Sequence, residues 1–145
     1  EEGLVDPYRS IQVGIRGSNY GPGDYQGTRD LGYELITMYE LQEIGLEAAL
    51  ERIHRRVGAT PCFISIDIDA VDPAYAPGTG TPEVDGFTSR EILKLVRGLR
   101  GLSFKAADVV EVLPALDPGE ITAYLGGNLI YELISLLALR KKEDG

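Results

Sequence analysis

A nearly continuous apolar run from Pro61 to Asp67 constrains the fold more than any other feature of the sequence. Such a run is typical of a strand covered on both faces, as the strands of parallel sheets are. Two aspartates, Asp67 and Asp69, stand at its carboxyl end, and a loop rich in Gly, Pro and Thr follows. Side chains two positions apart on a strand share a face, with roots about 6–7 Å apart. The run therefore brings two carboxylates together where a buried strand ends.

The rest of the chain predicts alternating strands and helices. Thr88 and Glu91 have the spacing of a capping box, and Asp117-Pro118 is typical of a helix start. The predicted strands are 10–16, 34–38, 61–67 and 106–112, and the predicted helices are 46–57, one that begins at Thr88, and 117–142. The long segment 17–32 is either a functional loop or contains a short helix. This order predicts one α/β domain with a mostly parallel sheet.

Length and charge exclude several classes of protein. The 145 residues fit one domain, and a net charge of −9 argues against a nucleic-acid partner, because phosphates repel an acidic surface. The most apolar segment, 121–139, carries Asn128, Glu132 and two glycines, so we expect a core helix rather than a membrane span. We expect no signal peptide, because no basic-then-apolar pattern opens the sequence, and the single Cys62 is expected to be a buried, reduced thiol. The expected location is the cytoplasm.

Three carboxylates are expected at one edge of the sheet. Asp67 and Asp69 end one strand and Glu111 lies near the end of another, and ligands of such sheets bind at the carboxyl ends of the strands. Carboxylates that close raise one another's pKa unless a cation neutralises them, and hard oxygen ligands suit Mg, Ca or Mn. Alternatively, Asp67 and Asp69 only cap the following loop through Asx-turns. The spacing alone leaves both interpretations open, and it assigns a turn to Asp72-Pro73.

Three segments resemble the ureohydrolase family, which contains arginases, agmatinases and guanidino-acid hydrolases. The longest is SIDIDAVDPAYAPGTGTPEVDGFTSRE, from Ser65 to Glu91. QVGIRGSNYGPGDY at 12–25 and DVVEVLPALDPGEITAYLGGNLIYELI at 108–134 extend the resemblance over essentially the whole chain. GIRGSNY, APGTGTPE, TSRE and NLIYELI resemble the agmatinase branch more than arginase.

The resemblance implies a three-layer α-β-α fold and a binuclear manganese amidinohydrolase. Two Mn²⁺ ions would activate a hydroxide that attacks the guanidinium carbon and releases urea. Asp67 and Asp69 would be metal ligands, Glu111 would hold the substrate guanidinium, and Thr81 would line the site near it. The alternatives are a strand-end salt bridge for Glu111 and a turn-forming role for Thr81.

The sequence also departs from the family pattern. The family needs an upstream histidine ligand, an Asp-x-His-x-Asp cluster and a further histidine, and none of them is present. The only histidine, His54, lies on an amphipathic helix and is expected to be a solvated surface residue. We therefore expect residues 1–145 to be the C-terminal half of a ureohydrolase, inactive alone, with no catalytic group assigned on this chain.

The expected reaction of the whole protein is hydrolysis of agmatine, a small cationic guanidino compound, to putrescine and urea. The alternative substrates are 4-guanidinobutanoate and 3-guanidinopropanoate, and the loop Ser18-Asn19-Tyr20 is a candidate for telling them apart. By family analogy the protein forms a homo-oligomer, a trimer or hexamer. Three alternatives do not make the chain part of an active enzyme. They are a non-catalytic homologue, an assembly fragment and a plain metal-binding domain.

Overall fold

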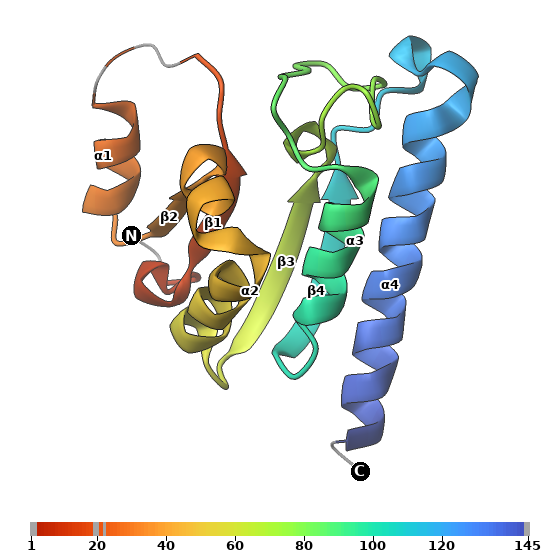
Figure 1. Ribbon diagram of the computed structural model, residues 1–145. Coiled ribbons are helices and arrows are strands. Elements are labelled where there is room, and N and C mark those ends of the chain that lie inside the picture. The colour runs from red at the N-terminus through yellow and green to blue at the C-terminus, as the bar shows by residue number, and fades with distance from the viewer. Residues whose placement is uncertain (1–2, 19–20, 22, 144–145) are drawn as a thin grey trace.

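The computed structural model describes residues 3–18, 21 and 23–143, and it is an α/β structure (Figure 1). The strands are β1 (Ile11–Ile15), β2 (Glu34–Thr37), β3 (Pro61–Asp67) and β4 (Ser103–Val110). The helices are α1 (Asp24–Asp30), α2 (Met38–Val57), α3 (Ser89–Gly98) and α4 (Ile121–Glu143). Short 3-10 helices span Pro7–Arg9, Ile68–Ala70, Pro114–Leu116 and Pro118–Glu120.

The predicted parallel pairing of strands is confirmed. β1 pairs in parallel with β2, and β3 pairs in parallel with β4, with Asp67 opposite Val110 at the carboxyl end. Within the described ranges these pairs form two two-stranded sheets rather than one sheet. The arrows of β3 and β4 point the same way in Figure 1, so the carboxyl ends of these two strands open on the same side.

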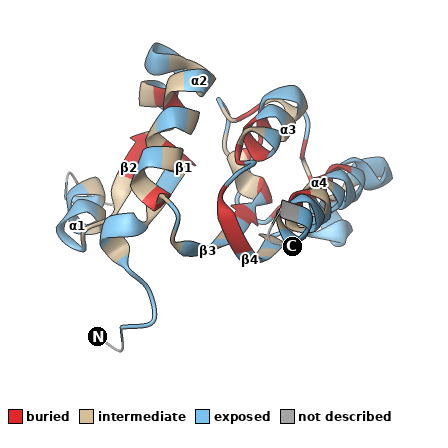
Figure 2. Cartoon of the chain, turned by 90° about the horizontal axis from the view of Figure 1, so that it is seen from below, coloured by how far each residue is buried: buried red, intermediate tan, exposed pale blue. Residues whose placement is uncertain are grey.

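The helices cover the sheets through their apolar faces. α2 contacts β1 and β2, while α4 contacts both β4 and α3. In α4 the buried leucines recur every three or four residues, and in Figure 2 the buried parts of α3 and α4 face β3 and β4. These leucines are Leu125, Leu129, Leu133 and Leu136. The capping box of α3 is confirmed, because Thr88 and Glu91 bond each other's backbone N–H.

One alternative of the prediction is confirmed in α1, and the start of α2 differs from the prediction. The segment 17–32 contains the short helix α1, as one of its two interpretations proposed. α2 begins at Met38 rather than at residue 46, because the Thr37 hydroxyl accepts a hydrogen bond from the Glu40 N–H and caps it. Gly45 has φ 81° and interrupts the helix, so the periodic pattern becomes visible only after it.

Three predictions of burial are wrong or only partly right. His54 is partly buried rather than solvated, and its Nε2 lies 2.8 Å from the Gly98 carbonyl oxygen, because the end of α2 packs against α3. Strand β3 is not covered on both faces: Ile66 is buried, but Phe63 is 60% exposed. Cys62 is partly rather than fully buried, and its surroundings still raise the pKa of the thiol by desolvation.

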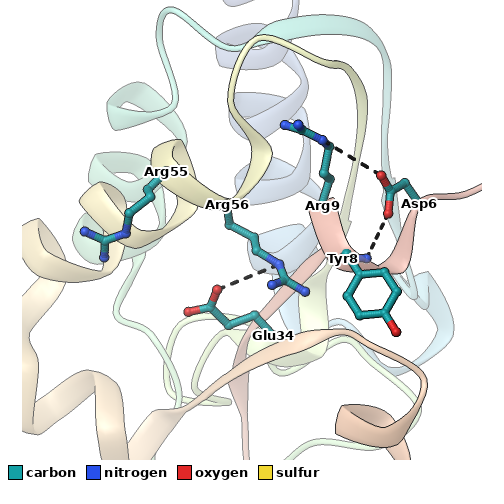
Figure 3. A pocket seen from close by; sticks show the side chains of 6 residues that line it. All are labelled: Asp6, Tyr8, Arg9, Glu34, Arg55 and Arg56. Carbon is teal, nitrogen blue, oxygen red and sulfur yellow. Dashed lines mark hydrogen bonds and ion pairs between the residues drawn. The ribbon is translucent and has the colours of Figure 1, made fainter.

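A cavity of about 500 Å³ lies at the amino ends of β1 and β2, away from the carboxylates. Its lining residues are Asp6, Tyr8, Arg9, Glu34, Arg55 and Arg56 (Figure 3). Arg56 donates to the Ser10 carbonyl at 3.2 Å, to the Pro7 carbonyl at 3.1 Å and to the Gly32 carbonyl. These bonds occupy the guanidinium and fasten the N-terminal segment to α2.

The outer face of α4 carries large exposed side chains. They are Ile121, Tyr124, Ile130, Tyr131, Ile134 and Leu139. By length and composition alone, Pro118–Lys142 could cross a membrane, a property that core helices of globular proteins share. The prediction of a core helix is confirmed only for the face of α4 that carries the buried leucines Leu125, Leu129, Leu133 and Leu136. The exposed face, together with Phe63, leaves apolar surface open to a partner.

We expect the 145-residue chain to self-associate when it is produced alone, since such apolar surface gains free energy on burial. Sedimentation velocity over a range of concentrations measures this. Ile130→Glu with Ile134→Glu should weaken the association. The control Arg90→Glu changes the net charge by the same amount away from this face and should leave association unchanged. A wild-type chain that stays monomeric at all concentrations contradicts the expectation.

Candidate metal and substrate site

Asp67 is the last residue of β3, and its side chain is exposed at the carboxyl end of the strand. Its Oδ1 accepts a hydrogen bond of 2.9 Å from the Asp69 N–H, which caps the 3-10 helix Ile68–Ala70. This confirms the Asx-type cap that was one interpretation of Asp67. Partial desolvation of the carboxyl group, with a smaller contribution from the Asp69 charge, raises the pKa of Asp67. A nearby cation would relieve both effects.

Asp69 is held by two threonines of the segment 71–88, which we call the threonine loop. The hydroxyl of Thr79 donates to Asp69 Oδ1, and the hydroxyl of Thr81 donates to Oδ2. Thr81, the predicted site residue, is exposed, whereas Thr79 is only 1% exposed. Thr79 was not among the residues predicted from the sequence. The alternation of the Gly-Thr-Gly-Thr run could have indicated it, because positions two apart can face the same carboxylate.

Glu111 comes directly after β4 and is tied to the same loop through its main chain. The Thr79 hydroxyl lies 3.0 Å from the Glu111 carbonyl oxygen, and the Leu113 N–H donates to the Gly78 carbonyl at 2.8 Å. Glu111 has φ 63°, which a non-glycine residue rarely adopts and which often marks a functional position. Its carboxylate is exposed at the edge of the sheet where β3 ends.

Asp67, Asp69 and Glu111 all follow the carboxyl ends of β3 and β4, but in the described part of the chain they do not make up a metal-binding group of three. No group of three or more His, Cys, Asp or Glu side chains that could hold a metal ion occurs there. The main chain of Glu111 reaches Asp69 through Thr79, but the three side chains do not form a common ligand set. β4 ends at Val110, and Glu111 follows it with a positive φ.

The threonine loop is fixed at both ends by hydrogen bonds. At its base, the Asp72 N–H donates to the Phe87 carbonyl and the Phe87 N–H to the Ala70 carbonyl, both at 2.9 Å. The predicted turn at Asp72 is confirmed, since its carboxylate accepts from the Ala74 and Gly86 N–H groups. The hydrogen bond from Ala74 is the main cause that lowers the pKa of Asp72.

The loop is also fastened to the start of α4. The Gly78 N–H donates to the buried Thr122 hydroxyl at 2.7 Å. A Cβ at position 78 would lie 2.4 Å from the Cβ of Asp117, so only glycine fits. Asp117 accepts from the Thr122 and Ala123 N–H groups and thereby caps the helix. The position of Thr79 therefore depends on the core helix α4.

The donor set suits a hard divalent cation but supplies only part of its coordination. Asp67 and Asp69 offer carboxylate oxygens at a strand end, and Asp69 is oriented by hydroxyl donors as metal-ligating carboxylates are. Two carboxylates fall short of the usual coordination of Mn²⁺ or Mg²⁺. Of the candidates for substrate selection, Ser18-Asn19-Tyr20, the residues Asn19 and Tyr20 lie outside the described residues.

Comparison with known proteins identifies the class. A model of the Arginase family matches residues 1–135. A guanidinopropionase of Pseudomonas aeruginosa is 53% identical over 138 residues, which are 95% of this chain and 43% of that protein. A mitochondrial agmatinase of Gallus gallus is 42% identical over 137 residues, 94% of this chain and 40% of that protein. The solved proclavaminate amidino hydrolase of Streptomyces clavuligerus superposes with TM-score 0.89 at 41% identity, over 94% of this chain and 46% of that one.

The chain belongs to the Arginase family, which confirms the resemblance seen in the sequence. Its fold is the α/β fold of the solved members, also as predicted. It spans less than half the length of the relatives that it matches.

The raised pKa of Asp67 gives a prediction about stability and pH. The unfolded carboxyl titrates near 3.8, whereas the folded one keeps its proton to higher pH. Between the pKa of the unfolded carboxyl and the higher pKa of the folded one, the folded state binds more protons. The free energy of unfolding therefore falls as pH rises through this range. Asp67→Asn should remove this fall in metal-free protein, because the amide stays neutral and its oxygen still caps Asp69. Urea unfolding at a series of pH values measures it.

Asp72→Asn is the matched control, since the pKa of Asp72 is lowered rather than raised. The Asp72 carboxyl makes the free energy of unfolding rise with pH, opposite in sign to the effect of Asp67. Asp72→Asn should remove this rise. Equal pH dependence of wild type and Asp67→Asn would contradict the assignment.

The buried Thr79 hydroxyl gives a second prediction. Thr79→Val keeps the shape of the side chain but removes the single O–H donor that lies within reach of both Asp69 Oδ1 and the Glu111 carbonyl. We expect a loss of about 1–3 kcal/mol in the free energy of unfolding, the range for an unsatisfied buried group. Thr79→Ser should restore most of it, and Thr81→Val should have less effect because water reaches that position. Equal stability of the two valine variants would contradict the role of Thr79.

Proposed function

We propose that the chain supplies part of the active site of a binuclear manganese amidinohydrolase, within a longer protein whose C-terminal portion is residues 1–145. One observation carries the proposal: Asp67 and Asp69 stand at the carboxyl end of β3, and Asp69 is oriented by Thr79 and Thr81. Parallel strands place their ligands at this end. Membership of the Arginase family supports the class of reaction.

The chemistry assigns separate tasks to the residues. When bound, Mn²⁺ ions supply a water activated at neutral pH and polarise the substrate. Asp67 and Asp69 hold the metal, and the remaining ligands come from outside this chain's described residues. Glu111 accepts paired hydrogen bonds from the planar guanidinium, a charge-assisted geometry that orients the carbon to be attacked. Thr81 orients Asp69 through its hydroxyl. The products are urea and an amine.

Agmatine is the first candidate substrate, as the sequence suggested, and the agmatinase of Gallus gallus supports it. A guanidino acid is the second candidate, and the higher identity of 53% to a guanidinopropionase favours it specifically. The two classes share the guanidinium and differ in the charge of the far end, amine or carboxylate. The proposed partners are therefore one small guanidino substrate and further copies of the same protein, in the cytoplasm.

The test is urea release with added Mn²⁺ from agmatine, 4-guanidinobutanoate and 3-guanidinopropanoate. Both the 145-residue chain and the whole protein that contains it are assayed. Urea release by the whole protein but not by the 145-residue chain supports the proposal. The compound that is hydrolysed best identifies the substrate. Turnover by the 145-residue chain contradicts the partial site. Metal uptake without turnover by the whole protein favours a non-catalytic homologue.

Asp67→Ala and Asp69→Ala in the whole protein should each lower the bound Mn²⁺ and abolish urea release, because each removes a proposed ligand. Metal analysis after gel filtration measures the stoichiometry. Asp108→Ala, an exposed aspartate on β4, is the matched control and should keep both. Wild-type metal content in both variants would remove the ligand assignment.

Glu111→Gln should keep the metal but weaken the hold on the guanidinium, since the neutral amide cannot accept two charge-assisted bonds. We expect kcat/KM to fall by about 100-fold or more, which corresponds to roughly 2.7 kcal/mol. Steady-state kinetics together with metal analysis separate the two effects. Wild-type kinetics would exclude the proposed role of Glu111.

A further inference from the structure

Arg16, the residue directly after β1, places its guanidinium among four backbone carbonyls. Its Nη2 lies 2.7 Å from the Asp69 oxygen, 2.6 Å from the Glu83 oxygen and 3.4 Å from the Val71 oxygen. Its Nε donates to the Val84 carbonyl at 2.9 Å. The acceptors are more than fifty residues away in sequence, so these bonds are purely tertiary.

The four carbonyls belong to the two ends of the segment that carries the candidate site. Asp69 and Val71 lie just after β3, and Glu83 and Val84 follow Thr81. Between them lie both threonines that hold the Asp69 carboxylate. Arg16 thus connects the two ends of this segment through hydrogen bonds and also links the segment to the sheet of β1 and β2.

The surroundings of Arg16 are shaped to admit it. A Cβ at Gly86 would lie 2.6 Å from Arg16 Nη2 and 2.5 Å from the Asp72 nitrogen, so the guanidinium fits because position 86 is glycine. Gly17 has φ 91°, and a Cβ there would lie 2.8 Å from a Glu83 carboxylate oxygen. Glycines on both sides therefore let the end of β1 approach the threonine loop.

Only arginine can make this set of bonds. The guanidinium presents several N–H donors in one rigid plane, so it reaches carbonyls on both ends of the segment at once. A lysine ammonium has three donors at a single point on a flexible stem. Lysine would retain the charge but could not hold both ends in a fixed geometry.

We propose that Arg16 is a positioning residue for metal binding, which fixes the main chain at Asp69 so that its carboxylate meets the cation in the correct orientation. This inference rests on the proposed function, since it needs the Asp69 carboxylate to be a metal ligand. Arg16 touches carbonyl oxygens and acts on the cation through Asp69.

The sign of the effect separates positioning from simple electrostatics. Arg16 is itself a cation, so its charge opposes the binding of Mn²⁺ nearby. If charge were its only influence, Arg16→Met would tighten Mn²⁺ binding. Positioning predicts the reverse for Arg16→Met, and it also predicts weaker binding for Arg16→Lys, in which the charge is kept.

The matched control is Arg56, which also donates to three backbone carbonyls but at the opposite end of the strands. Arg56→Met should lower the melting temperature as Arg16→Met does, because both lose carbonyl bonds. It should leave Mn²⁺ affinity unchanged, since Arg56 contacts the N-terminal segment and Glu34 rather than the site.

The experiment uses the whole protein that contains the chain. Mn²⁺ affinity is measured from the EPR signal of free aqueous Mn²⁺, and melting and steady-state kinetics are measured in parallel. Arg16→Met and Arg16→Lys should each weaken Mn²⁺ binding by about 10- to 100-fold, the range for residues that orient metal ligands. At saturating Mn²⁺ we expect KM to stay near its wild-type value, because the guanidinium contacts of Glu111 are untouched.

Two outcomes overturn the inference: Mn²⁺ affinity at or above the wild-type value in the Arg16 variants, or equal loss of affinity in Arg56→Met, which would make the effect one of global stability. If Arg16→Met does not fold, the Mn²⁺ affinity of Arg16→Lys, compared with that of the wild type, tests the inference. Wild-type protein that binds no Mn²⁺ and releases no urea overturns the proposed function, and this inference with it. Wild-type activity with unaffected Arg16 variants overturns this inference alone.

Discussion

The hydrogen bonds to the Asp69 carboxylate are the interaction on which the candidate site depends. A carboxylate beside a second one at the end of a strand is destabilising unless donors or a cation compensate its charge. Thr79 and Thr81 supply two donors, one from inside the protein and one from its surface. Because Thr79 also approaches the Glu111 carbonyl, the same side chain links the residues that follow β3 and β4.

Those contacts in turn rest on the core. Gly78 is fastened to the N-terminus of α4 through Thr122, and α4 is held by its leucine face against β4 and α3. Arg16 joins the opposite side of the loop to β1. The threonine loop is therefore fixed by two separate elements, α4 and β1, so its shape depends on tertiary packing as well as on local turn preferences.

Local patterns predicted much of the fold. The capping box at Thr88, the turn at Asp72 and the parallel strands around Asp67 all follow from short-range chemistry, and all are confirmed. The misses came from tertiary contacts: His54 is partly covered by α3, and β3 is exposed on the side of Phe63. Likewise, Thr79 looked like one more loop residue, because burial is not visible in a run of Gly, Pro and Thr.

The sequence by itself determined the α/β order, the family and the positions of Asp67, Asp69 and Glu111 along the chain, because periodicity, capping and motif spacing are local properties. Only the tertiary structure decided which groups meet. Among the described residues it forms no group of three potential metal ligands, and it places the Asp69 carboxylate on the hydroxyls of Thr79 and Thr81. It also brought Arg16 to carbonyls far along the chain, because a guanidinium finds its acceptors through the packing of distant strands and loops.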